Sequence, residues 1–169
     1  LPYLKPGDLT RGNAAIDEAA TKAGRDPREI VRLLNVTPNE SPDDLVQLAL
    51  DEGVSVFVVM GDDAQTINRV GTEVIPQVVE RVADERARRG TRAGERVRRA
   101  SALAKRMPDI AYDGIPSSLV ATAVEPGDQS YARYTASYMR GGSPGLVLRP
   151  QTVAEVQDAV IFARDHRSV

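Results

Sequence analysis

The sequence predicts an α/β protein assembled from two incomplete pieces, and three observations support this prediction. A strand, a helix, a second strand and a long helix follow one another between about residues 29 and 81. A further strand and helix occupy residues 145–166, and an arginine-rich stretch separates the two pieces. Because neither piece is long enough to be a domain, we expect the chain to span the junction between two domains of a larger protein.

The composition excludes several classes of protein. The 169 residues are 41% hydrophobic and 27% charged, as in soluble domains, and the net charge is -2. With no cysteine and one histidine, His166, the chain offers no disulfide framework, no thiolate or histidine-rich metal site and no cysteine nucleophile. The longest apolar run, 54–60, is too short to span a membrane. The first residues lack the features of a signal peptide and are typical of a chain already in progress. We expect a cytoplasmic, metal-independent protein.

The first elements of the first piece are a helix and a strand. Residues 13–23 are rich in alanine and predict a helix with one buried face, which Gly24 is placed to end. The apolar positions of that face are Ala15, Ile16, Ala19, Ala20 and Ala23. Residues 29–36 are β-branched and bounded by Pro27 and Pro38. Their apolar side chains do not alternate, so we expect a strand that is buried on both faces.

The next two elements have clearer boundaries. Ser41 is a good N-cap for a helix over residues 42–52, which Gly53 closes. Residues 54–60 are nearly all apolar, which is typical of a parallel strand covered on both sides. We expect this segment to be a core strand.

A long helix follows residues 61–63. An apolar stripe runs from Ile67 to Val82, and Pro76 is expected to kink this helix or mark a new start. Alternating strands and helices with short turns predict a parallel α/β fold. Two architectures fit this order, a (β/α)8 barrel and an open doubly wound sheet.

The first piece resembles the C-terminal end of a bacterial luciferase-like flavin-dependent oxidoreductase. The residues that carry the resemblance are Ala19-Ala20, Ala23 to Pro27, Ile30 to Asn35, Leu45-Val46, Asp51 to Val54, Phe57 and Glu73 to Pro76. The resemblance implies the C-terminal βαβα portion of a (β/α)8 barrel, namely its last two strands and helices. It also implies a flavin, FMN or a deazaflavin, across the C-terminal ends of the strands.

Candidate cofactor-binding residues lie where these two strands end. The resemblance places Asn39, Met60 and Gly61 at this rim, with Asn35 near it. The same residue types are also ordinary at strand ends. Most cofactor and substrate contacts in the family come from earlier strands, so no catalytic residue is assigned.

The region between the two pieces is strongly basic. From Arg81 to Arg106 it has nine arginines and one lysine against three acidic residues. Such a run is also found in nucleic-acid-binding surfaces, but no aromatic residue is interleaved and Gly90 and Gly94 interrupt it. We expect a solvated helix end and a linker. The predicted domains are 1–89, a linker over 90–116, and 117–169.

The second piece begins with aromatic and glycine-rich segments. Tyr131, Tyr134 and Tyr138 have the spacing of one helical face and are expected in a core. The glycine-rich residues 140–145 lack the ending of a phosphate-binding loop and predict a turn into a strand at 146–149. A capping box, Thr152 to Glu155, then starts a helix. The side chains expected to face inward on it are Val156, Ala159, Val160 and Ala163.

This second piece resembles the start of the FAD-binding domain of FAD-linked oxidases, the group with berberine bridge enzyme-like and vanillyl-alcohol-oxidase-like proteins. The residues that carry the resemblance are Tyr138, Pro144 to Pro150, Thr152 to Val156, Ala159-Val160 and Phe162 to Arg164. The family's main FAD-binding turn follows this helix, and it has no counterpart up to Val169.

Together these features predict a fragment of a flavin-dependent oxidoreductase in which a monooxygenase-like barrel is fused to an FAD-linked oxidase domain. We expect the parent protein to act on a small molecule, and an oligomeric parent is compatible with these features. We expect this chain by itself to be inactive. One alternative is a noncatalytic α/β interaction module, in which residues 146–149 pair beside 54–60. Another is an arginine-mediated nucleic-acid adaptor.

Overall fold

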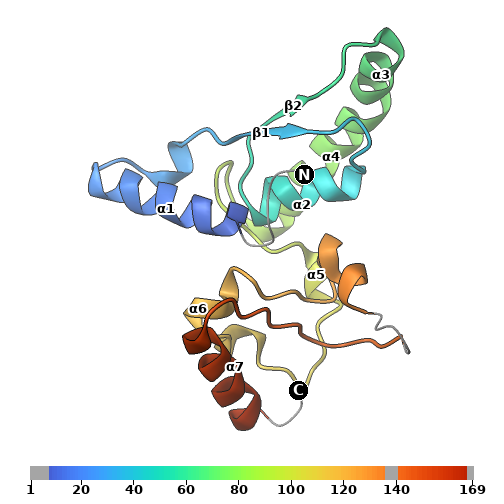
Figure 1. Cartoon of the computed structure of the whole chain (residues 1–169). Helices are drawn as coiled ribbons and strands as arrows, with labels where there is room; N and C mark the ends of the chain where they lie inside the picture. The colour runs from blue at the N-terminus through green and yellow to red at the C-terminus, as the bar shows by residue number, and fades with distance from the viewer. Residues whose placement is uncertain (1–7, 136–140, 167–169) are drawn as a thin grey trace. The chain divides into compact units, whose positions relative to one another are not determined.

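The computed structural model describes residues 8–135 and 141–166, and it divides them into two compact units. Residues 12–99 form the N-terminal unit, and residues 100–166, with 8–11, form the C-terminal unit. The described chain is a mixed α/β structure that is mostly helical, with one two-stranded parallel sheet (Figure 1). The α/β prediction is therefore confirmed at this level, and a portion of a barrel remains a prediction.

The parallel sheet pairs β1, Leu33–Val36, with β2, Val56–Val59. The register places Leu33 opposite Val56 and Val36 opposite Val59. Helix α2, Pro42–Asp51, connects the strands and starts with the predicted capping box of Ser41 and Asp44. The sequence of strand, helix and strand was thus predicted correctly, although β1 is shorter than expected. The segment before it forms the 3-10 turn η1, Pro27–Glu29.

One face of this sheet packs against helices. Val36 belongs to a buried cluster with residues of α2 and of the long helical region, and Leu34, Phe57 and Val59 pack against the cluster. The members of the cluster besides Val36 are Leu45, Val46, Leu50, Val70, Val74 and Val78. The core of the N-terminal unit therefore lies between the sheet and the helices α2 and α4 (Figure 1).

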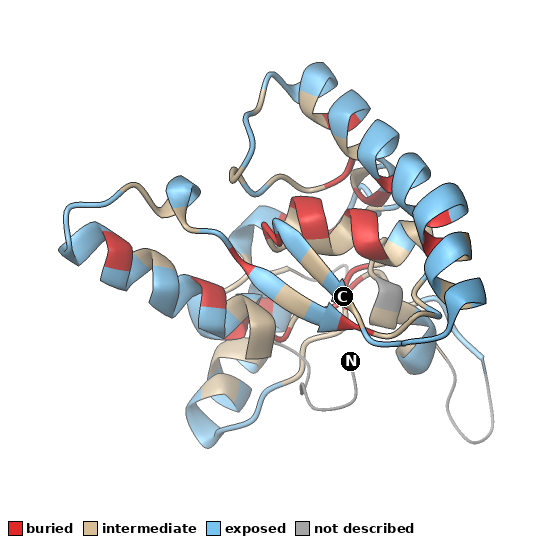
Figure 2. Cartoon of the chain, turned by 90° about the horizontal axis from the view of Figure 1, so that it is seen from above, coloured by how far each residue is buried: buried red, intermediate tan, exposed pale blue. Residues whose placement is uncertain are grey.

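The other face of the sheet is exposed, which corrects the prediction of strands buried on both sides. Leu33 is 60% exposed and Val58 42% exposed, and the exposed residues alternate with buried or half-buried ones along both strands. Figure 2 shows the two strands mainly in the colours of exposed and intermediate residues, whereas α2 carries buried ones. The apolar composition of residues 54–60 therefore does not reflect burial on both faces within the described chain.

The long helical region contains an irregular turn just before Pro76, where the sequence predicted a kink or a new start. Helix α3, Ala64–Arg69, continues as a π-helical turn, Val70–Val74, into α4, Ile75–Arg89. Proline has no N–H to donate, and its ring would collide with the carbonyl group four residues earlier in a regular α-helix. The wider π turn, in which the Ile75 N–H donates to the Val70 oxygen, accommodates Pro76.

Helix α1, Asp8–Lys22, ends before Gly24 as predicted, but it turns a different face inward. Gly24 has a φ of 71°, which favours glycine after a helix end. The buried residues of α1 are Asn13 and Ala20, whereas Ile16 is exposed. Ala20 is therefore buried as predicted, but the other apolar positions of the predicted face are exposed, and the inward face also carries the polar Asn13.

The C-terminal unit has a small core and little regular structure. Ile110, Tyr112, Leu146 and Phe162 form its buried cluster. Its elements are α5, Ala100–Leu103, the 3-10 turn η3, Tyr112–Gly114, α6, Ser117–Val120, the 3-10 turn η4, Gln129–Tyr134, and α7, Val153–Asp165. Tyr138 of the predicted aromatic row lies outside the described residues.

Two predictions for the C-terminal unit are corrected. Residues 146–149, predicted as a strand, form a single antiparallel bridge, between Val147 and Val124. Thr152 does cap α7, but the helix buries Phe162, while Val156 and Val160 are exposed.

Candidate functional site

The predicted cofactor-binding residues lie at the C-terminal edge of the parallel sheet. Asn39 is exposed in the turn after β1, and Met60 and Gly61 are exposed directly after β2. The Met60 N–H donates to the Val36 oxygen at 2.9 Å, which places Met60 beside the end of β1. Asn35 lies on the exposed face of β1 and is opposite Val58 in the register. The structure thus brings Asn39, Met60 and Gly61 to one edge.

This edge is held by contacts from the neighbouring loops. Arg69 of α3 donates through Nη2 to the Pro38 oxygen at 2.5 Å, and Thr37 donates to the Glu40 carboxylate at 3.1 Å. Asp63 caps α3 by accepting from the Thr66 N–H at 2.8 Å. The bond with the Thr66 side chain, followed by the Thr66 N–H, lowers the pKa of Asp63, so the capping carboxylate stays ionised. The groups that the edge offers to a ligand are the Asn39 amide, the Met60 thioether and the Gly61 backbone.

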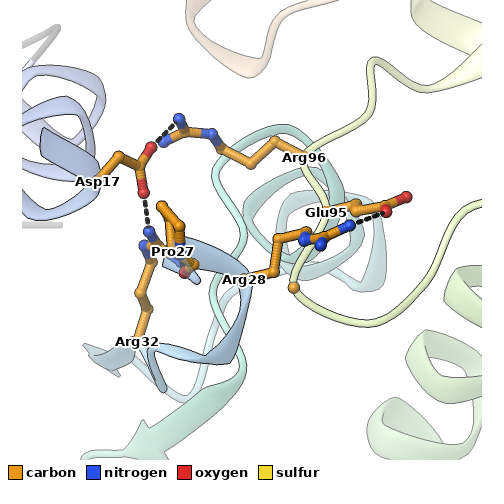
Figure 3. Close-up of a pocket in the computed structure, with 7 residues that line it drawn as sticks. Asp17, Pro27, Arg28, Arg32, Glu95 and Arg96 are labelled. Atoms are coloured by element: carbon orange, nitrogen blue, oxygen red, sulfur yellow. Dashed lines mark hydrogen bonds and ion pairs between the residues drawn. The ribbon is translucent and has the colours of Figure 1, made fainter. Parts of the chain in front are cut away.

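A second group of residues surrounds a cavity at the opposite end of the strands. The cavity has a volume of about 350 Å³, and its lining residues are Asp17, Pro27, Arg28, Arg32, Gly94, Glu95 and Arg96 (Figure 3). Arg32 immediately precedes β1, and its backbone oxygen accepts from the Ser55 N–H just before β2. The cavity therefore lies at the N-terminal ends of both strands.

Asp17 is the link between two of the arginines in this cavity. Its carboxylate forms ion pairs with the Arg32 and Arg96 guanidinium groups, one through each oxygen (Figure 3). Arg32 is only 7% exposed, and its Nη1 makes long contacts of 3.4 Å with the Pro27 and Ile30 oxygens. A buried guanidinium needs a counter-charge, and Asp17 supplies it.

Arg28 forms the second ion-pair group of the cavity. It bonds to both Asp26 oxygens, at 2.5 to 2.9 Å, and to Glu95 at 3.1 Å. The guanidinium bond and the Arg28 N–H lower the pKa of Asp26 to about 2. The Arg92 N–H, followed by the Arg28 side chain, lowers the pKa of Glu95. Both carboxylates are therefore ionised across the physiological range.

The arginine-rich stretch is less solvated than predicted. Arg99 is buried and donates from its backbone N–H to Asp51 at 3.2 Å and from Nη2 to Gln47 at 3.1 Å. The Val97 N–H donates to the Leu50 oxygen at 2.8 Å, which ties the stretch to the end of α2. Arg99 is therefore engaged within the N-terminal unit, whereas the exposed arginines of the stretch are Arg81, Arg88, Arg89, Arg92 and Arg96.

Sequence reasoning missed the cavity because it followed the apolar residues of α1. Asn13, Asp17 and Ala20 share a helical face, at spacings of four and three residues. Asn13 is buried and donates from Nδ2 to both the backbone and the side chain of Glu52 at 2.9 Å. The available signal for the cavity was the polar pair Asn13 and Asp17 on one face of an alanine-rich helix. The sequence alone does not identify the partners of Asp17, which lie 15 and 79 residues away.

Residues 8–135 and 141–166 contain no group of three or more histidine and acidic side chains arranged to hold a metal ion. In the same ranges, every helix is too short or too polar to cross a membrane.

Comparisons with protein-family models, with curated proteins and with solved structures found no match for this chain.

Proposed function

We propose that this chain is part of a flavin-dependent oxidoreductase, with the N-terminal unit contributing the last two strands of a luciferase-like (β/α)8 barrel. The observation that carries the proposal is the asymmetry of the sheet. In such barrels, helices cover the outer face of parallel strands and side chains from other strands fill the interior. Here α2 and α4 cover one face, and the opposite face exposes Leu33, Val56 and Val58.

The exposed apolar face supports this proposal on energetic grounds. Burying apolar surface contributes about 25 cal/mol per Å², so a row of exposed leucine and valine side chains favours association with further structure. The neighbouring strands of the parent barrel would provide that cover. The candidate residues Asn39, Met60 and Gly61 would then face the flavin at the C-terminal ends of the strands.

We also propose that the C-terminal unit begins an FAD-linked oxidase domain of the same protein. The order of an extended segment at 146–149 and a helix capped by Thr152 supports this proposal. Val153, Val156 and Val160 form an exposed row on α7 at helical spacing. This row is suited to packing against the rest of an FAD-binding domain.

The proposal is tested on the product of the complete reading frame that encodes these residues. We expect that product to retain flavin on purification and to oxidise or oxygenate a small substrate through it, because the flavin carries the chemistry. Stop codons directly flanking residues 1 and 169, or a longer product that binds no flavin, would contradict the proposal.

Gly61→Ala is the sharpest variant for the barrel site. A Cβ at Gly61 would lie 3.6 Å from the Thr66 methyl group, which is an ordinary contact, so the fold tolerates it. A flavin that approaches the backbone here would collide with the new methyl group, and we expect its affinity to fall about tenfold. Gly71→Ala, where a Cβ meets nothing within 4 Å, is the matched control.

A further inference from the structure

The arginine cavity of the N-terminal unit is separate from the proposed flavin site. Its lining comes from α1, from the η1 turn with Arg32 before β1, and from residues 94–96. These segments meet at the N-terminal ends of the strands, whereas a barrel cofactor lies at the C-terminal ends. A ligand in this cavity would therefore be a different molecule from the flavin.

The guanidinium groups in the cavity are of the kind that bind anions. Three guanidinium groups, from Arg28, Arg32 and Arg96, line it against two carboxylates, from Asp17 and Glu95. Asp26 lies outside the lining but pairs with Arg28, so the ion-pair groups around the cavity are balanced in charge. Guanidinium groups bind phosphate and carboxylate groups through pairs of parallel hydrogen bonds, which makes arginine the preferred residue for such ligands.

Arg32 has hydrogen-bonding capacity that its present partners do not use. Its Nε is buried and has no hydrogen-bond partner among the residues that the structure describes, while its Nη1 makes only contacts of 3.4 Å. A buried N–H without a partner costs free energy, and a ligand oxygen would recover part of it. The buried Arg32 guanidinium is thus the group of the cavity that has hydrogen-bonding capacity left for a ligand.

Asp17 shows how an anion is accommodated between the arginines. Its two oxygens bridge Arg32 and Arg96, which come from segments 64 residues apart, in the manner of two phosphate oxygens (Figure 3). Asp17 is therefore an internal competitor for an external anion. Removing its charge would leave both guanidinium groups available.

The remaining lining indicates what else the ligand carries. A volume of about 350 Å³ is at the small end of the range for small-molecule sites. The lining has no aromatic side chain on which a base or flavin ring would stack, and the Asp17 and Glu95 carboxylates accept hydrogen bonds from hydroxyl groups. We propose that this cavity binds the phosphoryl group of a small hydroxylated phosphate ester, of the sugar phosphate class, between Arg32 and Arg96.

The test measures binding of inorganic phosphate and of glucose 6-phosphate to the 169-residue chain by calorimetry, with sodium chloride at equal ionic strength as the reference. We expect glucose 6-phosphate to bind more tightly than inorganic phosphate. Equal affinities would overturn the ester part of the proposal and identify free phosphate as the ligand. Binding of neither compound above the chloride reference would overturn the proposal as a whole.

Two variants with opposite expected effects separate binding from general stability. Arg96→Gln removes one of the two bridging guanidinium groups, and we expect about tenfold weaker binding. Asp17→Asn removes the internal competitor, and we expect about tenfold tighter binding. Arg88→Gln, at an exposed position on α4 outside the cavity lining, is the control and should bind as the unmodified chain does.

A purely structural ion-pair network would give a different pattern. Asp17→Asn would then weaken binding as much as Arg96→Gln does, or Arg96→Gln would behave like Arg88→Gln, and either result would contradict the proposal. Thermal melting of each variant verifies that it is folded. None of these measurements depends on flavin, so a failure here is distinct from a failure of the proposed oxidoreductase function.

Discussion

At the scale of single residues, the ionisation of Asp26, which caps the η1 turn, makes the stability of the fold depend on pH. Its pKa is lowered from 3.8 to about 2, mainly by the Arg28 side chain. A carboxylate with a lowered pKa stabilises the fold fully above its unfolded value, and this contribution is lost as the pH falls towards the folded value. We therefore expect stability to fall between about pH 4 and pH 2, measured by urea denaturation at each pH.

Asp26→Asn should reduce this pH dependence, because an amide does not titrate. Asp109→Asn, at an exposed position of the C-terminal unit, serves as the control and should leave the Asp26 contribution intact. An identical pH profile for the Asp26→Asn variant and the unmodified chain would show that the Asp26 and Arg28 pair does not stabilise the fold.

Gly94 is a second residue whose neighbours define a prediction. It has a φ of 83°, and a Cβ on it would lie 2.1 Å from the Arg28 backbone oxygen. We expect Gly94→Ala to destabilise the N-terminal unit by well over the ~1–2 kcal/mol that positive φ alone costs. Gly90→Ala is the matched control, because it has a φ of 62° and nothing within 4 Å of a Cβ. Equal losses in thermal melts would contradict the predicted clash.

At the scale of elements, the start of α2 depends on one side chain. Ser41 accepts from the Asp44 N–H at 3.2 Å, and Asp44 accepts from the Ser41 N–H at 3.2 Å. We expect Ser41→Ala to cost about 1 kcal/mol of unfolding free energy, because an N–H of the first turn loses its acceptor. Ser41→Asn should restore most of it, since asparagine is an equally good cap. Denaturant unfolding followed by circular dichroism measures both.

The starts of α2 and α7 were predicted well, whereas α1 begins at Asp8 and not at residue 13, and the inward faces of α1 and α7 were not predicted. Ser41 and Thr152 were identified as caps because capping involves bonds to residues three positions away, which the sequence contains. The inward faces of α1 and α7 were assigned from apolar spacing, and the structure buries Asn13 and Phe162 instead. A helix face is chosen by what lies beside it, and those partners are distant in the sequence.

At the scale of the whole molecule, the proposed barrel predicts that substitutions on the exposed sheet face have different effects in the 169-residue chain and in the proposed longer protein. We expect Leu33→Thr and Val58→Thr to change the stability of the 169-residue chain by less than about 0.5 kcal/mol, since both side chains are exposed. If a longer protein completes the proposed barrel, the same changes in it would place hydroxyl groups inside the barrel and cost about 1–3 kcal/mol each.

Val36→Thr provides the comparison, because Val36 is buried in the core of the N-terminal unit. It should destabilise both the isolated chain and the complete protein. Unfolding free energies of all three variants in both contexts test this prediction. If Leu33→Thr and Val58→Thr are neutral in the complete protein as well, the sheet face is not part of a barrel interior.

Local chemistry in the sequence was sufficient for the order of elements in the N-terminal unit. Proline, glycine and capping residues act on their immediate neighbours, so the βαβα order and the disturbance at Pro76 follow from short segments. The rim residues could be located for the same reason, since Met60 and Gly61 directly follow β2 and Asn39 lies in the turn after β1.

Only the tertiary structure determined burial, pairing and the arginine cavity. Residues 54–60 are apolar, but how far each is buried depends on which helices cover which face. Residues 146–149 have the composition of a strand, but a strand requires a partner, and Val147 finds only Val124. Asp17, Arg32 and Arg96 come together through ion pairs across 15 and 79 residues. Such contacts are determined by the packing of distant segments, which cannot be predicted from the spacing of residues within a short segment.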